Sequence, residues 1–403
     1  MAISEKEFSQ LGYTTQLLHS GTVRDTGFDS MNIPIYQTSN FRLGTAENGG
    51  ALFAGEKEGY TYTTFGNPTV RLLEEKIAAL EHADDAVCTG SGMAAIATTL
   101  WCTASAGKHI VADTTLFGDS FGLLKNVFDA RYGIDVDFVD FNDPDALKSA
   151  LRDNTCCVYF ESPSNPTMKI VDIKKVSDLV HGFNSDIKVI IDNTFATPYL
   201  QQPLDLGADV VVHSTTKYLN GHGDVIGGAI CTNDADWMQY VRTIGMTALN
   251  GGQLDPFAAF LIIRGLKTFS LRMERHCANA RRVAEYLDNE PKCKKVYFPG
   301  LKTHPNHDVA ARQMKDFGGM ISFELYKRED GPKLLDNLKV LPVAISLGDV
   351  ETLLEQPATM THKAYTKEAL EEAGIPEGLV RMSVGLEDVE DIIGDLQQAF
   401  EKV

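Results

Sequence analysis

The chain has 403 residues, of which 43% are hydrophobic and 23% are charged, and its formal net charge at pH 7 is −18. This composition is typical of a folded globular protein and not of a disordered one, and the length predicts two packed domains. The acidic balance, together with the lack of any run rich in Lys and Arg, excludes nucleic acid as an expected partner.

The N-terminal region predicts an arm. Residues 1–60 contain Pro, Gly and aromatic residues without a sustained period, which favours an extended segment that needs a partner surface to lie on. The first ten residues are polar and have no apolar core of a signal peptide. Because no apolar stretch of the chain reaches the length of a membrane span either, we expect a cytoplasmic protein without a membrane partner.

Two helices are predicted after the arm. Asn67-Pro68-Thr69 is typical of a helix start and precedes the pattern VRLLEEKIAALEHA, and Thr89-Gly90-Ser91-Gly92 leads into MAAIATTLWC. Free backbone amides at the start of the second helix favour an anion, so Gly92 and Met93 are candidates for a phosphate cradle. Small residues at helix starts are common, and on its own this signal is weak.

A run of short β-rich segments follows, from Lys108 to Cys231: HIVAD, IDVDFVDF, CCVYFESP, KVIIDNT, ADVVVHSTTK and GGAICT. Their alternation with helix-like stretches predicts an α/β fold with a mostly parallel sheet covered by helices on both faces. Ligands of such sheets bind beyond the carboxyl ends of the strands. The residues that follow each run are therefore the place to look for chemistry.

The C-terminal part predicts a second, smaller domain. A long helical pattern begins after Asp255, and the segments SLGDVETLLEQPATMTH and LVRMSVGLEDVEDIIGDLQQAF follow it. We expect an arm over residues 1–62, a large domain over 63–260 and a small domain over 261–403. Seven cysteines form no CxxC pair and no Cys/His cluster with zinc spacing, so we expect reduced thiols and no metal.

Lys217 is the most informative residue of the strand ends. It follows the buried-looking run ADVVV and the polar residues HSTT, and a lysine there acts as a nucleophilic amine when a desolvated or electropositive setting lowers its pKa. A snorkelling surface lysine explains the pentapeptide equally well. Ser214 and Thr216, on the same stretch, add hydroxyl donors for a phosphate, although ordinary strand polarity explains them too.

Asp192 closes the strand KVIID, where a carboxylate needs a cationic or hydrogen-bonding partner. A protonated pyridine nitrogen is such a partner, whereas an Asp that caps the following turn is the simpler interpretation in isolation. Taken together, the amine, the carboxylate and the phosphate cradle fit one ligand that carries an aldehyde, a pyridinium and a phosphate.

A resemblance to one enzyme family runs along nearly the whole chain and is carried by six stretches: YTYTTFGNPT, GSGMAAI, FESPSNPT, IDNTFATPYLQQPLDLGADVVVHSTTKYLNGHGD, SLGDVETLLEQPATMTH and GIPEGLVRMSVGLEDVEDI. These resemble the pyridoxal-phosphate enzymes of cysteine and methionine metabolism, the cystathionine γ-synthase and methionine γ-lyase group. The resemblance implies the aspartate-aminotransferase fold, with a central, mostly parallel sheet of the seven-stranded type and a smaller C-terminal α+β domain. It also implies pyridoxal 5′-phosphate as cofactor, a small amino acid as substrate, γ-elimination or γ-replacement as the reaction, and a homotetramer built from dimers.

The resemblance assigns roles to individual residues. Lys217 would be the Schiff-base lysine and general base, and Asp192 the partner of the pyridine nitrogen. The phosphate ligands would be Gly92, Met93, Ser214, Thr216 and, reaching into the neighbouring subunit, Tyr62. Asn165 would lie by the cofactor, and Arg381 would clamp the substrate α-carboxylate in a bidentate pair, with Ser346 and Thr361 shaping the clamp.

Four sites, one of them a pair of residues, depart from what methionine γ-lyases usually carry. The family's active-site tyrosine is Phe117 here, and the cysteine two residues further on is Asp119. The arginine two residues after the phosphate tyrosine is Thr64, and a Lys-Asp pair is replaced by Thr247 and Ala248. Joint loss of a charged network indicates replacement rather than damage, because losing a single partner leaves the others buried and unpaired.

The departures predict altered specificity. Phe117 keeps a surface that stacks on the cofactor ring but removes a proton donor for the leaving group, although O-succinylhomoserine sulfhydrylases of the family can also carry phenylalanine there. Asp119 places a negative charge beside that group, which favours a cationic side chain such as that of canavanine. An Asp119 that points to solvent, or that pairs with Lys125, would have no such role.

Three other functions stay open. Methionine or cystathionine γ-lyase activity and O-acylhomoserine sulfhydrylase activity are enzymatic alternatives. A cofactor carrier without catalysis is a fourth hypothesis, and the retention of Lys217, Asp192 and Arg381 argues against it.

Overall fold

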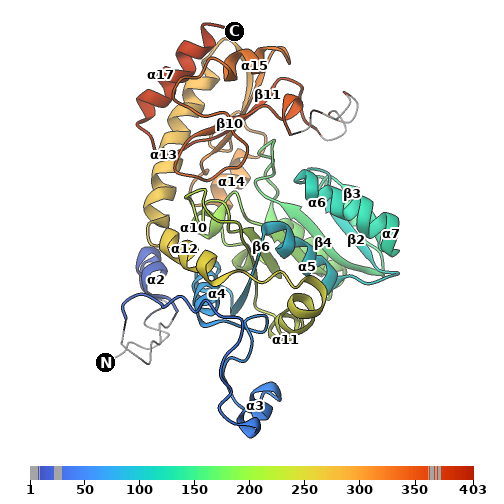
Figure 1. Ribbon diagram of the computed structural model, residues 1–403. Helices are drawn as coiled ribbons and strands as arrows, with labels where there is room; N and C mark the ends of the chain where they lie inside the picture. Colours follow the sequence, from blue (N-terminus) through green and yellow to red (C-terminus); the bar gives the residue numbers. More distant parts are fainter. Residues whose placement is uncertain are drawn as a thin grey trace.

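The computed structural model describes residues 8, 10–21, 30–361, 363, 367, 370 and 374–403. Figure 1 shows two layered bodies, each built around a sheet, with the C-terminus in the smaller of them.

The central sheet of the larger body has seven strands in the order β1-β7-β6-β5-β4-β2-β3. Strand β7 runs antiparallel to both of its neighbours, and the other pairs are parallel. The mostly parallel sheet predicted from the sequence is therefore confirmed. The strands are β1 (Asp85–Thr89), β2 (His109–Asp113), β3 (Asp135–Val139), β4 (Thr155–Glu161), β5 (Lys188–Asp192), β6 (Val210–Ser214) and β7 (Gly228–Thr232).

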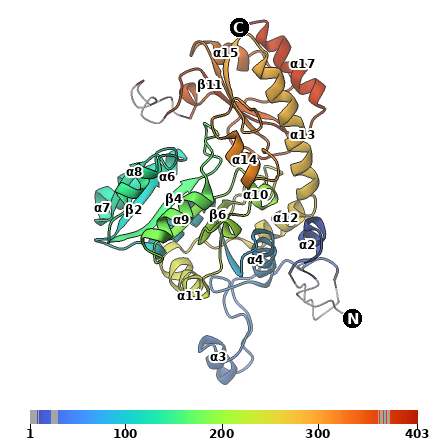
Figure 2. The same cartoon turned by 180° about the vertical axis from the view of Figure 1, so that it is seen from behind.

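Helices cover both faces of this sheet: Figure 1 shows α5 in front of it, and Figure 2 shows α8 and α9 from behind. Helix α4 (Pro68–Glu81) begins where the Asn67 side chain accepts a hydrogen bond from the Thr69 amide, and α5 (Gly92–Thr103) where the Ser91 hydroxyl accepts one from the Ala94 amide. Helix α5 packs against β6 and β7, whereas α4 packs against β1 and β7.

The remaining helical segments of this body are α6 (Gly118–Gly122), π-helix η1 (Leu123–Asp129), α7 (Ala130–Tyr132), α8 (Pro144–Ala150), α9 (Ile173–Phe183), α10 (Thr197–Leu200), 3₁₀-helix η2 (Pro203–Leu206), α11 (Ala235–Tyr240), π-helix η3 (Val241–Asn250) and α12 (Pro256–Leu266).

The smaller body has a four-stranded antiparallel sheet in the order β10-β11-β9-β8. Its strands are β8 (Cys293–Tyr297), β9 (Met320–Leu325), β10 (Leu353–Glu355) and β11 (Leu379–Ser383). Its helices are α13 (Phe269–Asp288), α14 (His307–Gln313), α15 (Asp330–Leu335), 3₁₀-helix η4 (Pro357–Thr359) and α17 (Val389–Phe400). The long helical pattern after Asp255 is divided into α12 and α13, and α13 packs along α17. The bounds of the arm and of the two domains, as expected from the sequence, stay a prediction.

The N-terminal arm is not wholly extended. Within its described part, α2 (Tyr13–His19) packs against α4 of the body, and α3 (Ala46–Phe53) projects beyond the body at the end of a long connection (Figures 1 and 2). The short amphipathic stretches that form these helices lack the sustained period from which a helix is predicted. Among the described helices, none is long and apolar enough to cross a membrane, and all seven cysteines are free thiols.

Candidate active site

The candidate site lies where three neighbouring strands end. Glu161, Asp192 and Ser214 close β4, β5 and β6, and Glu161 is the direct cross-strand neighbour of Asp192. Because β4, β5 and β6 are parallel, their carboxyl ends meet at one edge of the sheet. The topology thus brings together the loops that carry Asn165, Thr194 and Lys217.

Lys217 is half-buried in the loop after β6, and its Nζ donates a hydrogen bond to the Ser346 hydroxyl at 2.9 Å. Burial lowers the pKa of Lys217, and the nearby Arg381 cation lowers it further against the opposing influence of Asp349 and Glu355. The loop behind it is held by Arg272, whose Nη1 donates to the Tyr218 carbonyl oxygen at 2.8 Å. This is the setting of a nucleophilic amine rather than of a solvated lysine.

Arg381 is buried on β11 and joins segments that are far apart in sequence. Its Nη1 donates to Asn165 Oδ1 at 3.0 Å, and its Nη2 donates to the Ser346 carbonyl oxygen at 3.0 Å. Nη2 also forms an ion pair with Glu355 Oε1 at 2.7 Å. Ser346 adopts a left-handed backbone conformation with φ of 85°, which is strained for a residue with a side chain. That turn lets Ser346 contact Arg381 with its carbonyl oxygen and Lys217 with its hydroxyl.

Asp192 and Glu161 form a pair of carboxyl groups with raised pKa values. Burial raises the pKa of Asp192, although its Oδ1 accepts a hydrogen bond from the Thr194 amide at 2.9 Å. Burial and the neighbouring Asp192 charge raise the pKa of Glu161 well above its usual value. A cationic ring nitrogen beside Asp192 would offset the cost of burying this carboxylate, so the residue fits a pyridinium partner.

Glu161 also positions two predicted site residues. It accepts hydrogen bonds from the Phe117 amide at 2.7 Å and from the Asn165 amide at 3.4 Å. Glu161 was not predicted from the sequence, although, like Asp192, it is a carboxylate at the end of a buried strand. Its place at a strand end is the signal from which a role at the site could have been predicted.

The start of α5 faces the end of β6 and has the shape of an anion cradle. A Cβ atom on Gly92 would lie 2.7 Å from Ser214 Cβ, so this close approach requires glycine. The amides of Gly92 and Met93 are in the first turn of the helix, where an amide has no intrahelical acceptor. Thr216 is close to the same edge, but its hydroxyl exchanges hydrogen bonds with Gly227. Amides, hydroxyls, amine and carboxylate at this edge fit a phosphorylated pyridine aldehyde.

Replacement of Gly92 by alanine is expected to weaken binding of pyridoxal phosphate about tenfold, because the added methyl group forces α5 away from β6. Fluorescence titration of the cofactor-free protein measures the dissociation constant. Gly394→Ala is the matched control, since a Cβ atom there meets no atom within 4 Å. Equal affinity in both variants would contradict the cradle.

Other predicted residues lie further out. Tyr62 on the arm and Phe117 at the start of α6 are 44% and 40% exposed, and Asp119 and Thr361 are exposed as well. Lys125 forms an ion pair with Asp129 at 2.8 Å, so the alternative in which it pairs with Asp119 is wrong.

Uncharged residues, Thr64, Thr247 and Ala248, stand where the family has charged ones. The Thr247 hydroxyl donates to the Thr243 carbonyl oxygen within η3. Thr64 lines a hollow beside Arg71 and Arg242, and both arginines form ion pairs with Asp85. Both arginines are therefore already paired, and neither is free to take the place of the family's arginine at position 64.

Comparison with known proteins assigns the chain to an enzyme family. Residues 14–401 match the family described as Cys/Met metabolism PLP-dependent enzyme. The chain belongs to this family. Pyridoxal phosphate is therefore its cofactor, and the protein is a PLP-dependent lyase of amino-acid metabolism.

Named relatives match this chain over nearly its whole length. An L-methionine gamma-lyase of Fusobacterium nucleatum subsp. polymorphum is 54% identical, with 98% of this chain and 100% of the relative covered. An L-methionine gamma-lyase of Treponema denticola is 48% identical with complete coverage of both chains. A cystathionine beta-lyase of Lactococcus lactis subsp. cremoris is 43% identical, with 96% of this chain and 98% of the relative covered.

Solved structures of the family confirm the predicted fold class. The crystal structure of metB from Corynebacterium glutamicum superposes with a TM-score of 0.91 at 41% identity, covering 98% of this chain and 99% of that one. A cystathionine gamma-lyase from Lactobacillus plantarum, complexed with L-serine, has the same TM-score at 37% identity and the same coverage.

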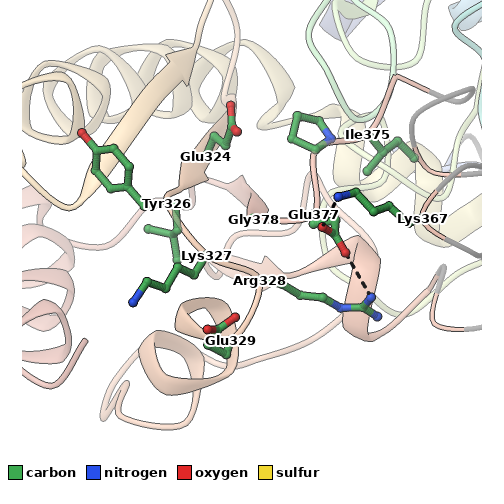
Figure 3. Close-up of a pocket in the computed structure, with 11 residues that line it drawn as sticks. Glu324, Tyr326, Lys327, Arg328, Glu329, Lys367, Ile375, Glu377 and Gly378 are labelled. Carbon is green, nitrogen blue, oxygen red and sulfur yellow. Dashed lines mark hydrogen bonds and ion pairs between the residues drawn. The ribbon is translucent and has the colours of Figure 1, made fainter.

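A second hollow, in the small domain, is separate from the candidate site (Figure 3). It is lined by the end of β9, by residues 326–329, by Lys367 and by the segment 375–378, and Lys217, Asp192 and Arg381 are not among these residues. Three of its charged groups pair with one another, because Glu377 lies 3.5 Å from Arg328 and 3.9 Å from Lys367. Such a hollow is a salt-bridged surface rather than a reactive centre.

Proposed function

We propose that the protein catalyses γ-elimination or γ-replacement on a small γ-substituted L-amino acid. The observation that carries this proposal is the connection of Lys217 to Arg381 through Ser346. It places one amine with a lowered pKa next to one guanidinium that suits a carboxylate. An α-amino acid needs these two groups at once, one for its α proton and one for its carboxylate.

Each residue then has a distinct task. Pyridoxal phosphate, when bound, withdraws electrons from the carbon atoms near the substrate nitrogen. Lys217 removes and returns protons there, and its lowered pKa keeps a neutral amine available at lower pH than for a free lysine. Asp192 holds the ring nitrogen in its charged form, and Arg381 and Asn165 orient the substrate carboxylate.

Phe117 limits the leaving groups that the site serves. Its amide is fixed by Glu161, and its side chain has no proton to donate to a departing atom. A leaving group that is already stabilised or positively charged needs such a donor least. This property supports a substrate with an activated γ substituent.

Asp119 supports a substrate with a cationic side chain, such as canavanine. The carboxylate is exposed at the first turn of α6, two residues from Phe117, and the cation of Lys125 is committed to Asp129. A negative charge in that place attracts a guanidinium and repels an anionic ester.

Replacement of Asp119 by asparagine is expected to lower kcat/KM for L-canavanine about fivefold and to leave L-methionine nearly unchanged, because one exposed charge contributes about 1 kcal/mol. Mass-spectrometric loss of each amino acid gives the two values. Asp178→Asn, which removes an exposed carboxylate on α9 that pairs with Lys174, is the matched control. Preferential consumption of methionine by the unaltered protein, with no effect of Asp119→Asn on canavanine, would contradict the cationic-substrate proposal.

Methionine γ-lyase activity is the second candidate, and the names of the relatives at 54% and 48% identity favour it. O-Acylhomoserine sulfhydrylase activity is distinguished by a requirement for sulfide. Parallel incubation with L-canavanine, L-methionine and O-acetyl-L-homoserine, with and without sulfide, separates these functions. A cofactor-bound protein whose absorption spectrum stays unchanged with every amino acid offered would revive the carrier hypothesis.

We also propose a homotetramer built from dimers in which the arms cross between subunits. Phe53, Tyr62 and Phe65 are 64%, 44% and 61% exposed, and their rings cluster on the arm that projects from the body. Exposed aromatic clusters of this kind are typical of interfaces. Sedimentation velocity measures the assembly, and a monomer would contradict it. The cytoplasmic location stays a prediction.

A further inference from the structure

Glu355 is a buried carboxylate directly opposite Arg381. The two residues are cross-strand partners on β10 and β11, and their side chains are 3% and 8% exposed. Glu355 Oε1 lies 2.7 Å from Arg381 Nη2. The guanidinium that suits the substrate carboxylate is therefore already paired with a protein carboxylate.

This pairing fixes the plane of the guanidinium. Of the five N–H groups of an arginine, three have acceptors here: Asn165 Oδ1, the Ser346 carbonyl oxygen and Glu355 Oε1. Among the described residues, the other two N–H groups have no protein acceptor. The protein thus leaves a small and defined part of Arg381 for a ligand.

The pairing also balances the charge of Arg381. Glu355 Oε2 is buried and has no hydrogen-bond partner within the described chain, a costly arrangement for a carboxylate oxygen. A neutral acceptor such as the amide oxygen of glutamine would accept the same hydrogen bond from Nη2, so this hydrogen bond does not by itself require a charged residue at position 355. The charge of Glu355 is therefore the property that needs explanation.

We infer that Glu355 is a positioning residue that orients Arg381 and, through its charge, weakens the hold of Arg381 on carboxylates. The inference rests on the proposed function, in which Arg381 receives the substrate carboxylate. A partly neutralised clamp binds the incoming amino acid and releases a product that keeps the same carboxylate.

Two substitutions separate charge from orientation. Glu355→Gln keeps an acceptor for Nη2 but removes the charge, so the dissociation constant of butanoate should fall about tenfold. Glu355→Asp keeps the charge but withdraws it from Nη2, so butanoate should bind no more tightly than to the unaltered protein. Calorimetric titration of the cofactor-loaded enzyme with butanoate, a carboxylate without an amine, measures both.

Controls make the outcomes unambiguous. Glu324→Gln, on the strand β9 that neighbours β11, removes a carboxylate that pairs with Lys294 of β8 and should leave butanoate affinity unchanged. Butanamide, which has no charge, should bind equally to the unaltered enzyme and to Glu355→Gln. Unchanged or weaker butanoate binding in Glu355→Gln overturns the inference about Glu355 alone. If Arg381→Lys binds butanoate as well as the unaltered enzyme does, Arg381 is not the carboxylate site, and both this inference and that part of the proposed function fail.

Discussion

Replacement of Lys217 by alanine is expected to lower lyase activity by at least about 10³-fold, because it removes both the amine that holds the cofactor and the base that moves substrate protons. The amine has a lowered pKa and one hydroxyl partner, Ser346, which is 2.9 Å away. Among the described residues, no other lysine forms a hydrogen bond with Arg381, Asn165 or Ser346. Release of 2-oxo acid and ammonia, measured with saturating pyridoxal phosphate, gives the activity.

The control for this variant is Lys174→Ala. Lys174 is exposed on α9 and pairs with Asp178, so its loss removes one lysine without touching the site. Cofactor absorbance should change in Lys217→Ala and stay unchanged in the control. Substantial activity in Lys217→Ala would mean that another group moves the α proton.

Replacement of Asp192 by asparagine is the second change with a large expected effect. An amide cannot balance a charged ring nitrogen, and the loss of one partner of a buried ion pair costs about 3–5 kcal/mol, which corresponds to a decrease in kcat of roughly 10²- to 10⁴-fold. The Asp192 carboxylate accepts a hydrogen bond from the Thr194 amide, and burial raises its pKa. A pH titration of the bound cofactor's absorbance should show that the ring nitrogen has lost its proton in this variant.

Asp113→Asn is the matched control, because Asp113 also closes a buried strand but pairs with Lys169 at 2.7 Å. That substitution should lower the free energy of unfolding while the activity of the folded enzyme is retained. If Asp192→Asn keeps its activity and only its stability falls, Asp192 is a structural carboxylate like Asp113.

The fold was predictable from the sequence because the signals of its strands are local. The segments KVIID and ADVVV contain the uninterrupted apolar runs VII and VVV, which are typical of strands buried on both faces, and each run lies in a strand of the central sheet. The arm was less predictable. Helix α3 has exposed apolar side chains and few partners in its own chain, so the short pattern at Ala46–Phe53 carried little periodic signal.

The candidate site was predictable only where a residue ends a strand or belongs to a recognisable motif. Asp192 ends β5, and Lys217 follows the end of β6 in the motif HSTTK, so the structure places both at the same edge of the sheet. Glu355 ends β10 and lies in the stretch SLGDVETLLEQPATMTH, but its role was not predicted, because its partner Arg381 is determined by the pairing of β10 with β11, which are separate in sequence. The contact of Ser346 with Lys217 likewise depends on a left-handed turn that no local pattern around a serine predicts.

We propose that Lys217 moves protons at both the α and the β carbon of the substrate, since a γ substituent leaves only after one proton has been removed from each of these carbons. Proton NMR of L-norleucine incubated with the cofactor-loaded enzyme in D₂O tests this directly, because norleucine resembles methionine but has no leaving group. The proposal predicts exchange of the α and β protons by the unaltered enzyme and of neither by Lys217→Ala. Exchange of the α proton alone would contradict γ-elimination and would assign the protein to chemistry at the α or β carbon.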